Sequence, residues 1–223
     1  MGLKILYEDN HLIAVYKPAG ILTQADKTGD VSLMDKVKLY LKEKYHKPGN
    51  VYLGLLHRLD RPVSGIVLFA KTSKGASRLS AQFRHQTVKK IYHCLVRGRP
   101  KQVKGVLRNY LKKDEKRNKV IIYKNKQKGS EIAELYYEVI DTNDNYSLLR
   151  VELKTGKPHQ IRSQLAYLGC PIVGDLKYGA PFALADKSIA LSATQLSFQT
   201  ATGEKRIELS VPAPLIWEKY IKK

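Results

Sequence analysis

The sequence contains very little cysteine, and this excludes several classes of protein. Its 223 residues include only two cysteines, Cys94 and Cys170. Two cysteines cannot form the disulfide framework of a small secreted domain, and neither has a second cysteine close by, as a metal or redox site would require. We therefore interpret both as buried, reduced thiols of a cytoplasmic protein.

Metal-binding patterns and long apolar runs are missing as well. The six histidines are scattered through the chain, and none stands at a spacing typical of zinc sites. No stretch approaches the roughly 20 apolar residues that a membrane helix needs. The first residues do not form an apolar segment with a small-residue cleavage site. We therefore expect no structural metal, no membrane span and no signal peptide.

Acidic residues are scarce relative to basic ones. Forty Lys and Arg residues face 20 Asp and Glu residues, which gives a net charge of +20. Residues 89–128 hold fifteen of the basic residues and only two of the acidic ones, so +13 of the total lies there. Such clustering favours a surface that binds nucleic acid. A membrane surface fits less well because strand-like residues interrupt the basic stretch, and a merely solubilising surface is the remaining alternative.

The hydrophobic pattern predicts many strands and a few helices. Strands are expected at residues 3–7, 12–16, 66–70, 88–96, 103–110, 119–124, 131–140, 146–153, 189–198 and 206–211. Helices are expected between Ser32 and Tyr45, over residues 73–86, and between Pro158 and Gly169. This succession indicates an α+β fold with a mostly antiparallel sheet. We expect a single domain over residues 1–223, in which residues 112–128 form a basic hairpin or loop.

One polar loop combines a carboxylate with several cationic side chains. Asp60 stands between Arg58 and Arg61, and the loop leads into the apolar strand expected at 66–70. Reactive groups are often carried on loops held by a rigid scaffold. An adjacent cation also favours the ionised carboxylate that a nucleophile needs. From the spacing alone, a solvated Asp–Arg pair in a turn explains the loop better.

Two further segments carry side chains suited to a nucleic-acid site. Arg162 follows the helix start expected at Pro158, from which it could reach a buried or half-buried carboxylate, and a helix N-terminus attracts anions. Tyr92 shares one face of a strand with Lys90, so its ring could stack on a base while lysines hold phosphate. The alternatives are a surface arginine on an amphipathic helix and an ordinary strand tyrosine.

Together these segments resemble the RluA-type pseudouridine synthases. The matching blocks, in chain order, are the opening strands from Ile5 through Lys17-Pro18-Ala19-Gly20, then His57-Arg58-Leu59-Asp60 with Pro62-Val63-Ser64-Gly65, Lys90-Ile91-Tyr92, His159-Gln160-Ile161-Arg162, and Pro171-Ile172-Val173-Gly174-Asp175 with Tyr178-Gly179. The resemblance covers nearly the whole chain. Five blocks in the right order make it specific, whereas the loop around Asp60 alone would be weak evidence.

The resemblance implies roles for individual residues. Asp60 corresponds to the catalytic aspartate, Tyr92 to a tyrosine that stacks against the target uracil, Arg162 to the basic partner of the aspartate, and Arg58 to an arginine that helps flip out the nucleotide. The implied fold has a mixed, mostly antiparallel sheet, flanking helices and a central active-site cleft, with no metal or organic cofactor. Whether the aspartate attacks ribose C1′ or uracil C6, or assists elimination at the ribose, stays open.

The partner that the resemblance implies is RNA, either ribosomal or transfer RNA. The side chains expected along its backbone are Lys89, Lys90, Lys112, Lys113, Lys116 and Arg117. Because the chain starts directly in the catalytic domain, we expect no amino-terminal S4-type RNA-binding domain, and RNA binding then comes from the catalytic domain itself. We expect a monomer with no obligate protein partner.

A few positions depart from the family pattern, and other functions compete with the one that it implies. The departures are Val63, Lys157-Pro158, Gln164 and Ser192. They weaken any assignment to a particular RNA target. One alternative is an RNA-binding or RNA-chaperone protein without catalysis. Another is a carboxylate-dependent DNA glycosylase, which would release a free base, and the last is a basic α+β domain of another role.

Overall fold

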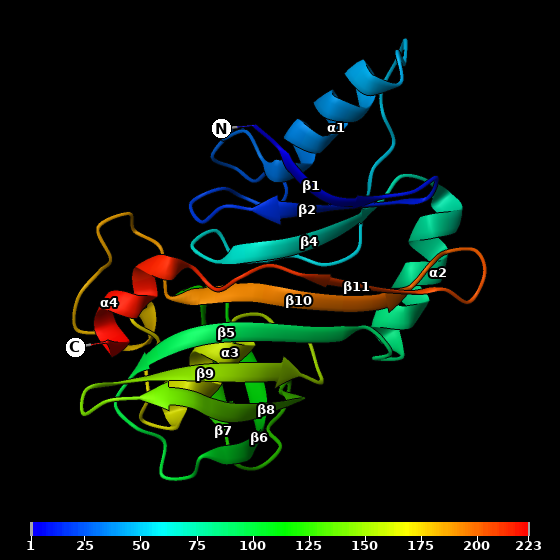
Figure 1. Ribbon diagram of the computed structural model, residues 1–223. Helices are drawn as coiled ribbons and strands as arrows, with labels where there is room; N and C mark the ends of the chain where they lie inside the picture. Colours follow the sequence, from blue (N-terminus) through cyan, green and yellow to red (C-terminus); the bar gives the residue numbers. More distant parts are fainter. Residues whose placement is uncertain (1, 223) are drawn as a thin grey trace. The chain divides into compact units, whose positions relative to one another are not determined.

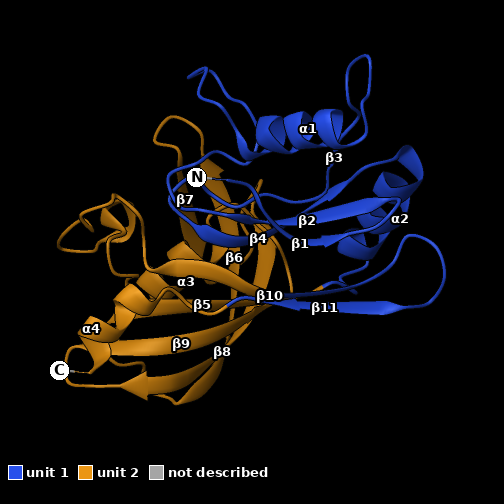
Figure 2. Cartoon of the chain, turned by 45° about the horizontal axis from the view of Figure 1, so that its top comes forward, with its two compact units in different colours: residues 1–88, 195–211 blue, residues 89–194, 212–223 orange. Residues whose placement is uncertain are grey.

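The computed structural model describes residues 2–222, which divide into two compact units (Figures 1 and 2). The first unit comprises residues 1–88 and 195–211, and the second comprises residues 89–194 and 212–223. Strand β10 (Leu191–Gln199) begins in the second unit and ends in the first. A late segment of the chain therefore completes the unit that the N-terminal part begins. The single domain expected from the sequence stays a prediction.

The first unit is a set of antiparallel strands with two helices. Its elements, besides the end of β10, are β1 (Lys4–Glu8), β2 (Leu12–Lys17), α1 (Leu33–Lys44), β3 (Gly54–Leu55), β4 (Ser64–Ala70), α2 (Ser73–Arg84) and β11 (Arg206–Ser210). Strand β2 pairs with β1 and β4, β3 pairs with β4, and β11 pairs with β10. Helix α2 packs against β3 and β4. Every residue of β4 is buried, which confirms the buried strand expected at 66–70, although β4 begins earlier, at Ser64.

Helix α1 starts where its side chains can satisfy its first backbone amides. Ser32 and Asp35 form a capping box, in which the Ser32 hydroxyl accepts from the Asp35 amide and the Asp35 carboxylate accepts from the Ser32 amide. Leu33, Val37 and Leu41 recur on one face and are buried. The helix start expected from the sequence is confirmed.

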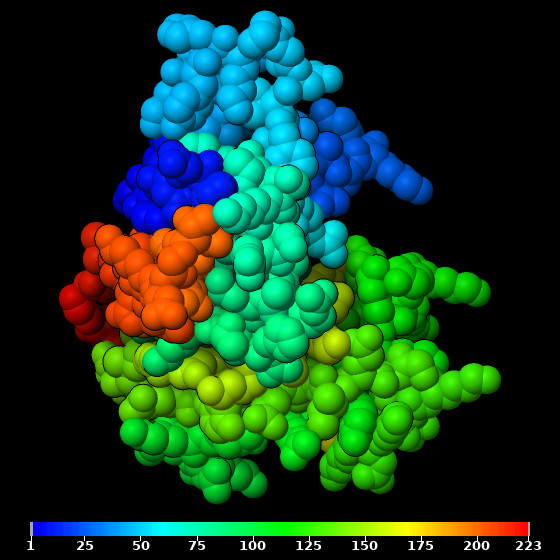
Figure 3. Space-filling model, turned by 90° about the vertical axis from the view of Figure 1, so that its right-hand side faces the viewer, coloured from blue at the N-terminus to red at the C-terminus, as the bar shows by residue number. Residues whose placement is uncertain are grey.

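The C-terminal segment joins the first unit beside helix α2. Figure 3 shows the surface of α2 next to the orange connection between β10 and β11. There the Gln82 amide nitrogen donates to the Gln199 carbonyl at 2.8 Å, and the Gln199 amide donates to the Gln82 side-chain oxygen at 2.9 Å. Hydrogen bonds between residues 117 positions apart thus tie the two segments of this unit together.

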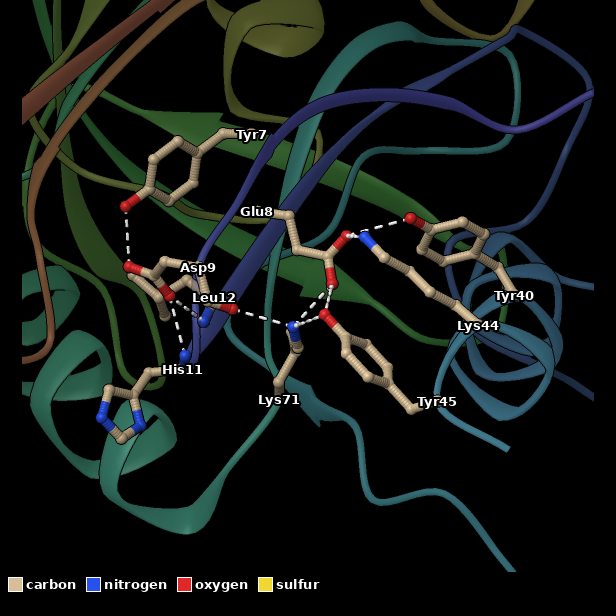
Figure 4. A network of polar contacts seen from close by, with 9 residues as sticks. All are labelled: Tyr7, Glu8, Asp9, His11, Leu12, Tyr40, Lys44, Tyr45 and Lys71. Atoms are coloured by element: carbon tan, nitrogen blue, oxygen red, sulfur yellow. Dashed lines mark hydrogen bonds and ion pairs between the residues drawn. The ribbon is translucent and has the colours of Figure 1, made fainter. Parts of the chain in front are cut away.

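The end of helix α1 is anchored on one half-buried carboxylate, that of Glu8 in β1, whose side chain is 10% exposed (Figure 4). One Glu8 oxygen accepts from Lys71 Nζ and from the Tyr45 hydroxyl, both at 2.6 Å. The other accepts from Lys44 Nζ at 2.8 Å and from the Tyr40 hydroxyl at 3.0 Å. Burial opposes the charge on Glu8, but these four donors outweigh it and lower the pKa of Glu8 to about 2.

Replacing Glu8 with glutamine is expected to lower the free energy of unfolding at pH 7 by about 1–3 kcal/mol, because charge-assisted hydrogen bonds are lost. The folded pKa of Glu8 lies below its ordinary value of 4.5, so the contribution of Glu8 is present above pH 4.5 and disappears as the pH falls toward 2. Urea denaturation at several pH values measures the difference. Glu208→Gln, in exposed β11, is the control and should leave stability unchanged. An equal loss in both variants would contradict the prediction.

The second unit is an antiparallel arrangement of longer strands with short helices. Its elements, besides the start of β10, are β5 (Lys89–Arg97), β6 (Lys104–Asp114), β7 (Lys119–Tyr123), β8 (Glu131–Thr142), β9 (Tyr146–Leu153), α3 (Gln160–Tyr167), the 3-10 turns Leu176–Tyr178 and Leu215–Trp217, and α4 (Glu218–Ile221). The strands pair in the order β5, β9, β8, β6, β7. Helix α3 packs against β6 and β7, and α4 packs against β9.

The basic hairpin and helix α3 differ in their bounds from the sequence predictions. The basic hairpin expected at residues 112–128 is confirmed, but β6 runs to Asp114 and so includes lysines that we expected in a loop. Helix α3 does not start at Pro158. It starts at Gln160, because His159 adopts a left-handed conformation with φ of 50° that cannot continue a helix backward. Its end is confirmed, since Gly169 follows it with φ of 87°.

The α+β fold with a mostly antiparallel sheet, as predicted from the sequence, is confirmed. Strand β3 and the elements after residue 211 were not expected, because each is too short to produce a periodic pattern. Among the residues that the structure describes, no helix is long and apolar enough to span a membrane.

Candidate active site

The loop that carries Asp60 lies between β3 and β4. It supplies one carboxylate, and the Val63 amide donates to the Asp60 carbonyl at 3.0 Å, which closes a tight turn. Asp60 is half-buried and Arg58 is exposed. The chain then enters β4 through Gly65, whose φ of 126° lies in the region that favours glycine. The loop thus ends in a tight turn that leads directly into a buried strand.

The segment that follows β2 holds this loop on both sides of Asp60. On one side, the Thr23 hydroxyl donates to the Leu59 carbonyl at 2.8 Å and accepts from the Leu59 amide at 3.2 Å. On the other side, the Gly20 amide donates to the Arg61 carbonyl at 2.8 Å, and Arg61 Nε donates to the Gly20 carbonyl at 3.0 Å. Because both neighbours of Asp60 are fixed, its backbone has little freedom to move.

His57 anchors the start of the same loop. Its Nε2 atom accepts from the Leu68 amide of β4 at 2.9 Å, and its ring stacks on Phe83 of α2 with a centroid distance of 5.0 Å. A ring nitrogen that accepts carries no proton, so the neutral imidazole of His57 carries its proton on Nδ1. These two contacts hold the start of the loop against β4 and α2.

Tyr92 and its neighbouring lysines lie on β5 in the second unit. Tyr92 is 8% exposed and pairs with Val151 of β9. Lys89 is exposed, whereas Lys90 is half-buried, and burial lowers the pKa of Lys90. Tyr92 therefore presents little of its surface, and Lys89 is the more accessible of the two lysines for phosphate.

Arg162 is held on α3 by a carboxylate whose role was not expected from the sequence. Its Nε donates to Asp175 Oδ2 at 2.7 Å and its Nη2 donates to Asp175 Oδ1 at 2.8 Å. The two side chains are only 7% and 1% exposed. A bidentate pair fixes the plane of the guanidinium group. The prediction that Arg162 reaches a buried carboxylate is confirmed for Asp175, and its pairing with Asp60 stays a prediction.

Comparison with known proteins decides the family of the chain. Residues 11–167 match the profile of the RNA pseudouridylate synthase family, an interval that contains Asp60, Tyr92 and Arg162. The chain belongs to this family. It is an RNA pseudouridine synthase, an isomerase that acts on RNA, as the resemblance of its motifs implied.

Curated relatives align with this pseudouridine synthase over almost its whole length. It is 31% identical over 219 residues to the ribosomal large subunit pseudouridine synthase C of Rickettsia prowazekii, which covers 97% of this chain and 70% of the relative. It is also 31% identical over 218 residues to the uncharacterized RNA pseudouridine synthase YhcT of Bacillus subtilis, covering 95% of this chain and 69% of the relative.

Solved structures share the fold of this enzyme. Human RNA pseudouridylate synthase domain containing 4 has a TM-score of 0.80 at 23% identity and covers 96% of this chain and 90% of its own. Human RNA pseudouridylate synthase domain containing 1 has a TM-score of 0.75 at 22% identity, with 97% and 86% covered. The likeness establishes the pseudouridine synthase fold.

The basic hairpin of the synthase exposes most of its charge. Lys112 and Lys113 lie at the end of β6, and Lys116 and Arg117 lie in the connection to β7; all four are exposed. Lys113 contacts Glu115 at 2.6 Å and Arg117 contacts Asp114 at 3.9 Å. Such exposed pairs are weak and exchange readily for phosphate partners.

Tyr178 connects this hairpin to the start of α3. Its hydroxyl accepts from the Val120 amide of β7 at 2.8 Å and lies 2.8 Å from His159 Nδ1. Its ring faces Arg162, with the guanidinium carbon 5.2 Å from the ring centroid. The sequence placed Tyr178 in a family motif but gave no sign of this contact, because Val120 lies 58 positions away.

The predicted site residues are thus distributed over both units. Arg58 and Asp60 belong to the first, whereas Tyr92, Arg162 and the basic hairpin belong to the second. Within residues 2–222, no group of three or more His, Cys, Asp or Glu side chains could hold a metal ion.

Proposed function

We propose that this enzyme isomerises uridines of ribosomal RNA to pseudouridine with Asp60 as its catalytic carboxylate. One observation carries the assignment: both neighbours of Asp60 are hydrogen-bonded to the segment after β2, so this carboxylate is held in place. Preorganised groups of this kind are what a reaction within a closed pocket requires. Relatives at 31% identity that are named for the large ribosomal subunit support ribosomal RNA as substrate.

The chemistry needs a carboxylate, a stacking surface and a cation. The N1–C1′ bond breaks, the uracil turns, and C5 joins C1′, while C5 loses a proton and N1 gains one, so the RNA keeps its composition. We propose that Asp60 supplies the anionic oxygen for attack at C1′, attack at C6 or elimination. In this proposal the exposed Arg58 helps to flip out the base, and Tyr92 stacks against the uracil. Arg162, which Asp175 orients, is the cation that pairs with Asp60.

Tritium release tests the proposal. Uridine that carries ³H at C5 loses it on isomerisation, so purified enzyme should release tritium from ribosomal RNA of cells that lack this gene. Transfer RNA from the same cells is the control substrate. RNA binding without release would favour a chaperone, and release of free uracil, seen as a loss of RNA mass, would favour a glycosylase. Release from transfer RNA alone would contradict ribosomal RNA as the substrate.

The basic hairpin is proposed to track the RNA backbone. A variant with four alanines, at Lys112, Lys113, Lys116 and Arg117, tests this proposal. The slope of the logarithm of the RNA association constant against log[salt] should become less steep by about 3, because each phosphate contact contributes about 0.7–0.9. Filter binding between 50 and 300 mM salt measures it. A control variant removes four exposed lysines of the first unit: Lys27, Lys42, Lys47 and Lys205. An equal change in both variants would show a general charge effect and contradict the proposal.

We also propose that the enzyme acts in the cytoplasm as a monomer. Cys94 and Cys170 are both buried, and burial raises the pKa of the Cys94 thiol, which keeps it protonated and unreactive. Thiols in this state suit a reducing compartment, where ribosomal RNA is also made.

A further inference from the structure

Strands β6, β8 and β9 of the second unit carry a hollow of about 390 Å³. Ligand sites in proteins have volumes of about 300–1,000 Å³, so this hollow has room for a ligand as large as a nucleotide. Six of its lining side chains stand in two adjacent cross-strand rows, one made by Lys104, Glu138 and Arg150 and the other by Val106, Tyr136 and Glu152.

The hollow lies on the face of this sheet that helix α3 does not cover. Gln164 of α3 donates to the side chain of Asn109 in β6, which marks the face that the helix covers. The same face continues across the sheet in a row made by Gly105, Tyr137, Val151 and Tyr92. Successive residues of a strand point to opposite faces, so Arg150, next to Val151, points away from the face of Tyr92. The hollow is therefore separate from the residues of this unit that are proposed for catalysis.

Arg150 brings a half-buried guanidinium group to the hollow. Of the two neighbouring carboxylates, Glu138 already contacts Lys104 Nζ at 2.7 Å. Glu152 likewise contacts Lys154 Nζ at 2.7 Å. These lysines lower the pKa of both carboxylates, and the charge of Arg150 adds to the effect at longer range. Within residues 2–222, however, Arg150 makes no side-chain hydrogen bond or ion pair. Since a guanidinium group has five N–H donors and no acceptor, it is available to an anionic ligand.

Tyr136 supplies an aromatic surface in the same hollow. Its side chain is 39% exposed, and it pairs across the strands with exposed Val106. The Tyr136 hydroxyl donates to Glu134 at 3.1 Å, and Lys154 Nζ lies 4.9 Å from the centre of the ring. Proteins that bind single-stranded nucleic acid combine such rings, on which bases stack, with cations that contact phosphates. The hollow therefore has the groups that a nucleotide needs.

We propose that this hollow binds one nucleotide of the RNA away from the active site, with its base against Tyr136 and its phosphate against Arg150. Two side chains at the hollow, Lys104 and Glu138, are 72% and 41% exposed, so a strand of RNA can enter and leave. A free small ligand is usually enclosed much more completely. An acidic protein segment is the competing occupant, but it would use the cations and leave the ring of Tyr136 without a stacking partner. The proposal does not depend on the role of Asp60.

Binding of a single-stranded oligoadenylate tests the proposal, because this RNA contains no uridine that the enzyme could isomerise. The measurement uses fluorescence anisotropy on the full chain with the four hairpin alanines described above, so that the basic hairpin does not mask the hollow. Tyr136→Ala and Arg150→Gln should each raise the dissociation constant about tenfold. Tyr136→Phe keeps the ring and should change it less than about twofold. Unchanged binding in both Tyr136→Ala and Arg150→Gln would overturn the proposal.

Arg108→Gln is the matched control. Arg108 lies on the same face of β6, is exposed and contacts Glu134 at 3.6 Å, but it does not line the hollow. Its loss removes the same charge and should change the dissociation constant less than about twofold. A loss as large as that of Arg150→Gln would show a general charge effect and overturn the proposal. Tighter binding of oligoglutamate than of oligoadenylate, with the same dependence on Arg150, would overturn it in favour of an acidic protein segment.

Ultraviolet crosslinking of oligoadenylate to the wild-type enzyme supplies a test that needs no variant. Mass spectrometry should find crosslinked nucleotides on the peptide of β8 that contains Tyr136. Crosslinks confined to other parts of the chain would overturn the proposal. Tritium release by the same preparation reports on isomerisation independently, so failure of the proposed function and failure of this binding site are distinguishable.

Discussion

Replacing Asp60 with asparagine is expected to abolish pseudouridine formation, with a loss of at least about 10⁴-fold in rate, while RNA binding changes little. Asparagine is nearly isosteric, and the bonds that fix the loop run through Leu59 and Arg61 rather than through the Asp60 side chain. The variant should therefore fold. It lacks the anionic oxygen that each of the three routes needs, and RNA affinity comes mainly from phosphate contacts.

The measurement pairs gel shift and tritium release on one preparation of Asp60→Asn. Asp30→Asn is the control, because Asp30 is also a carboxylate beside this loop and contacts Arg61 Nη2 at 2.7 Å, yet both side chains are about half exposed. Exposed pairs contribute little, so Asp30→Asn should keep its turnover. Substantial turnover by Asp60→Asn would refute the assignment, and loss of folding would show that Asp60 is structural.

Replacing Arg162 with methionine is expected to remove most turnover and also to destabilise the fold by about 3–5 kcal/mol. The cost arises because Asp175, which is 1% exposed, would keep a buried charge without its bidentate partner. Urea denaturation and tritium release per folded molecule measure the two effects separately.

A double variant separates the catalytic role of Arg162 from its role in stability. Arg162→Met combined with Asp175→Leu removes both members of the buried bidentate pair, so much of the lost stability should return. Turnover should stay lost, because the cation proposed to contact Asp60 is still missing. Near-normal turnover in the folded double variant would reduce Arg162 to a structural residue.

Three of the departures from the family pattern lie at buried positions, whereas Lys157 is half-buried and Pro158 is exposed. Gln164, which stands where histidine is frequent, has no exposed surface, and its amide donates to the Leu107 carbonyl at 3.1 Å and to Asn109 Oδ1 at 2.9 Å. It thus joins α3 to β6. Val63 and Ser192 are buried as well. Gln164 therefore serves to hold α3 against β6. The departures leave Arg58, Asp60, Tyr92 and Arg162 unchanged.

Local patterns in the sequence determined much of this protein. The run 66–70 indicated a buried strand, and Ser32 with Asp35 marked a helix start, because both signals depend on neighbouring residues alone. The order of the motifs identified the family and pointed to Asp60. The excess of positive charge in residues 89–128 located the basic hairpin before its strands were known.

Only the tertiary structure decided which side chains meet. Arg162 and Asp175 are 13 positions apart, Lys17 and Arg61 are 44 apart, and the hydroxyl of Tyr178 reaches an amide 58 positions away. Such contacts depend on strand register and on the path of loops, which no local pattern specifies. The start of α3 at Gln160 has the same origin, because the left-handed His159 is held by Tyr178 from a later part of the chain.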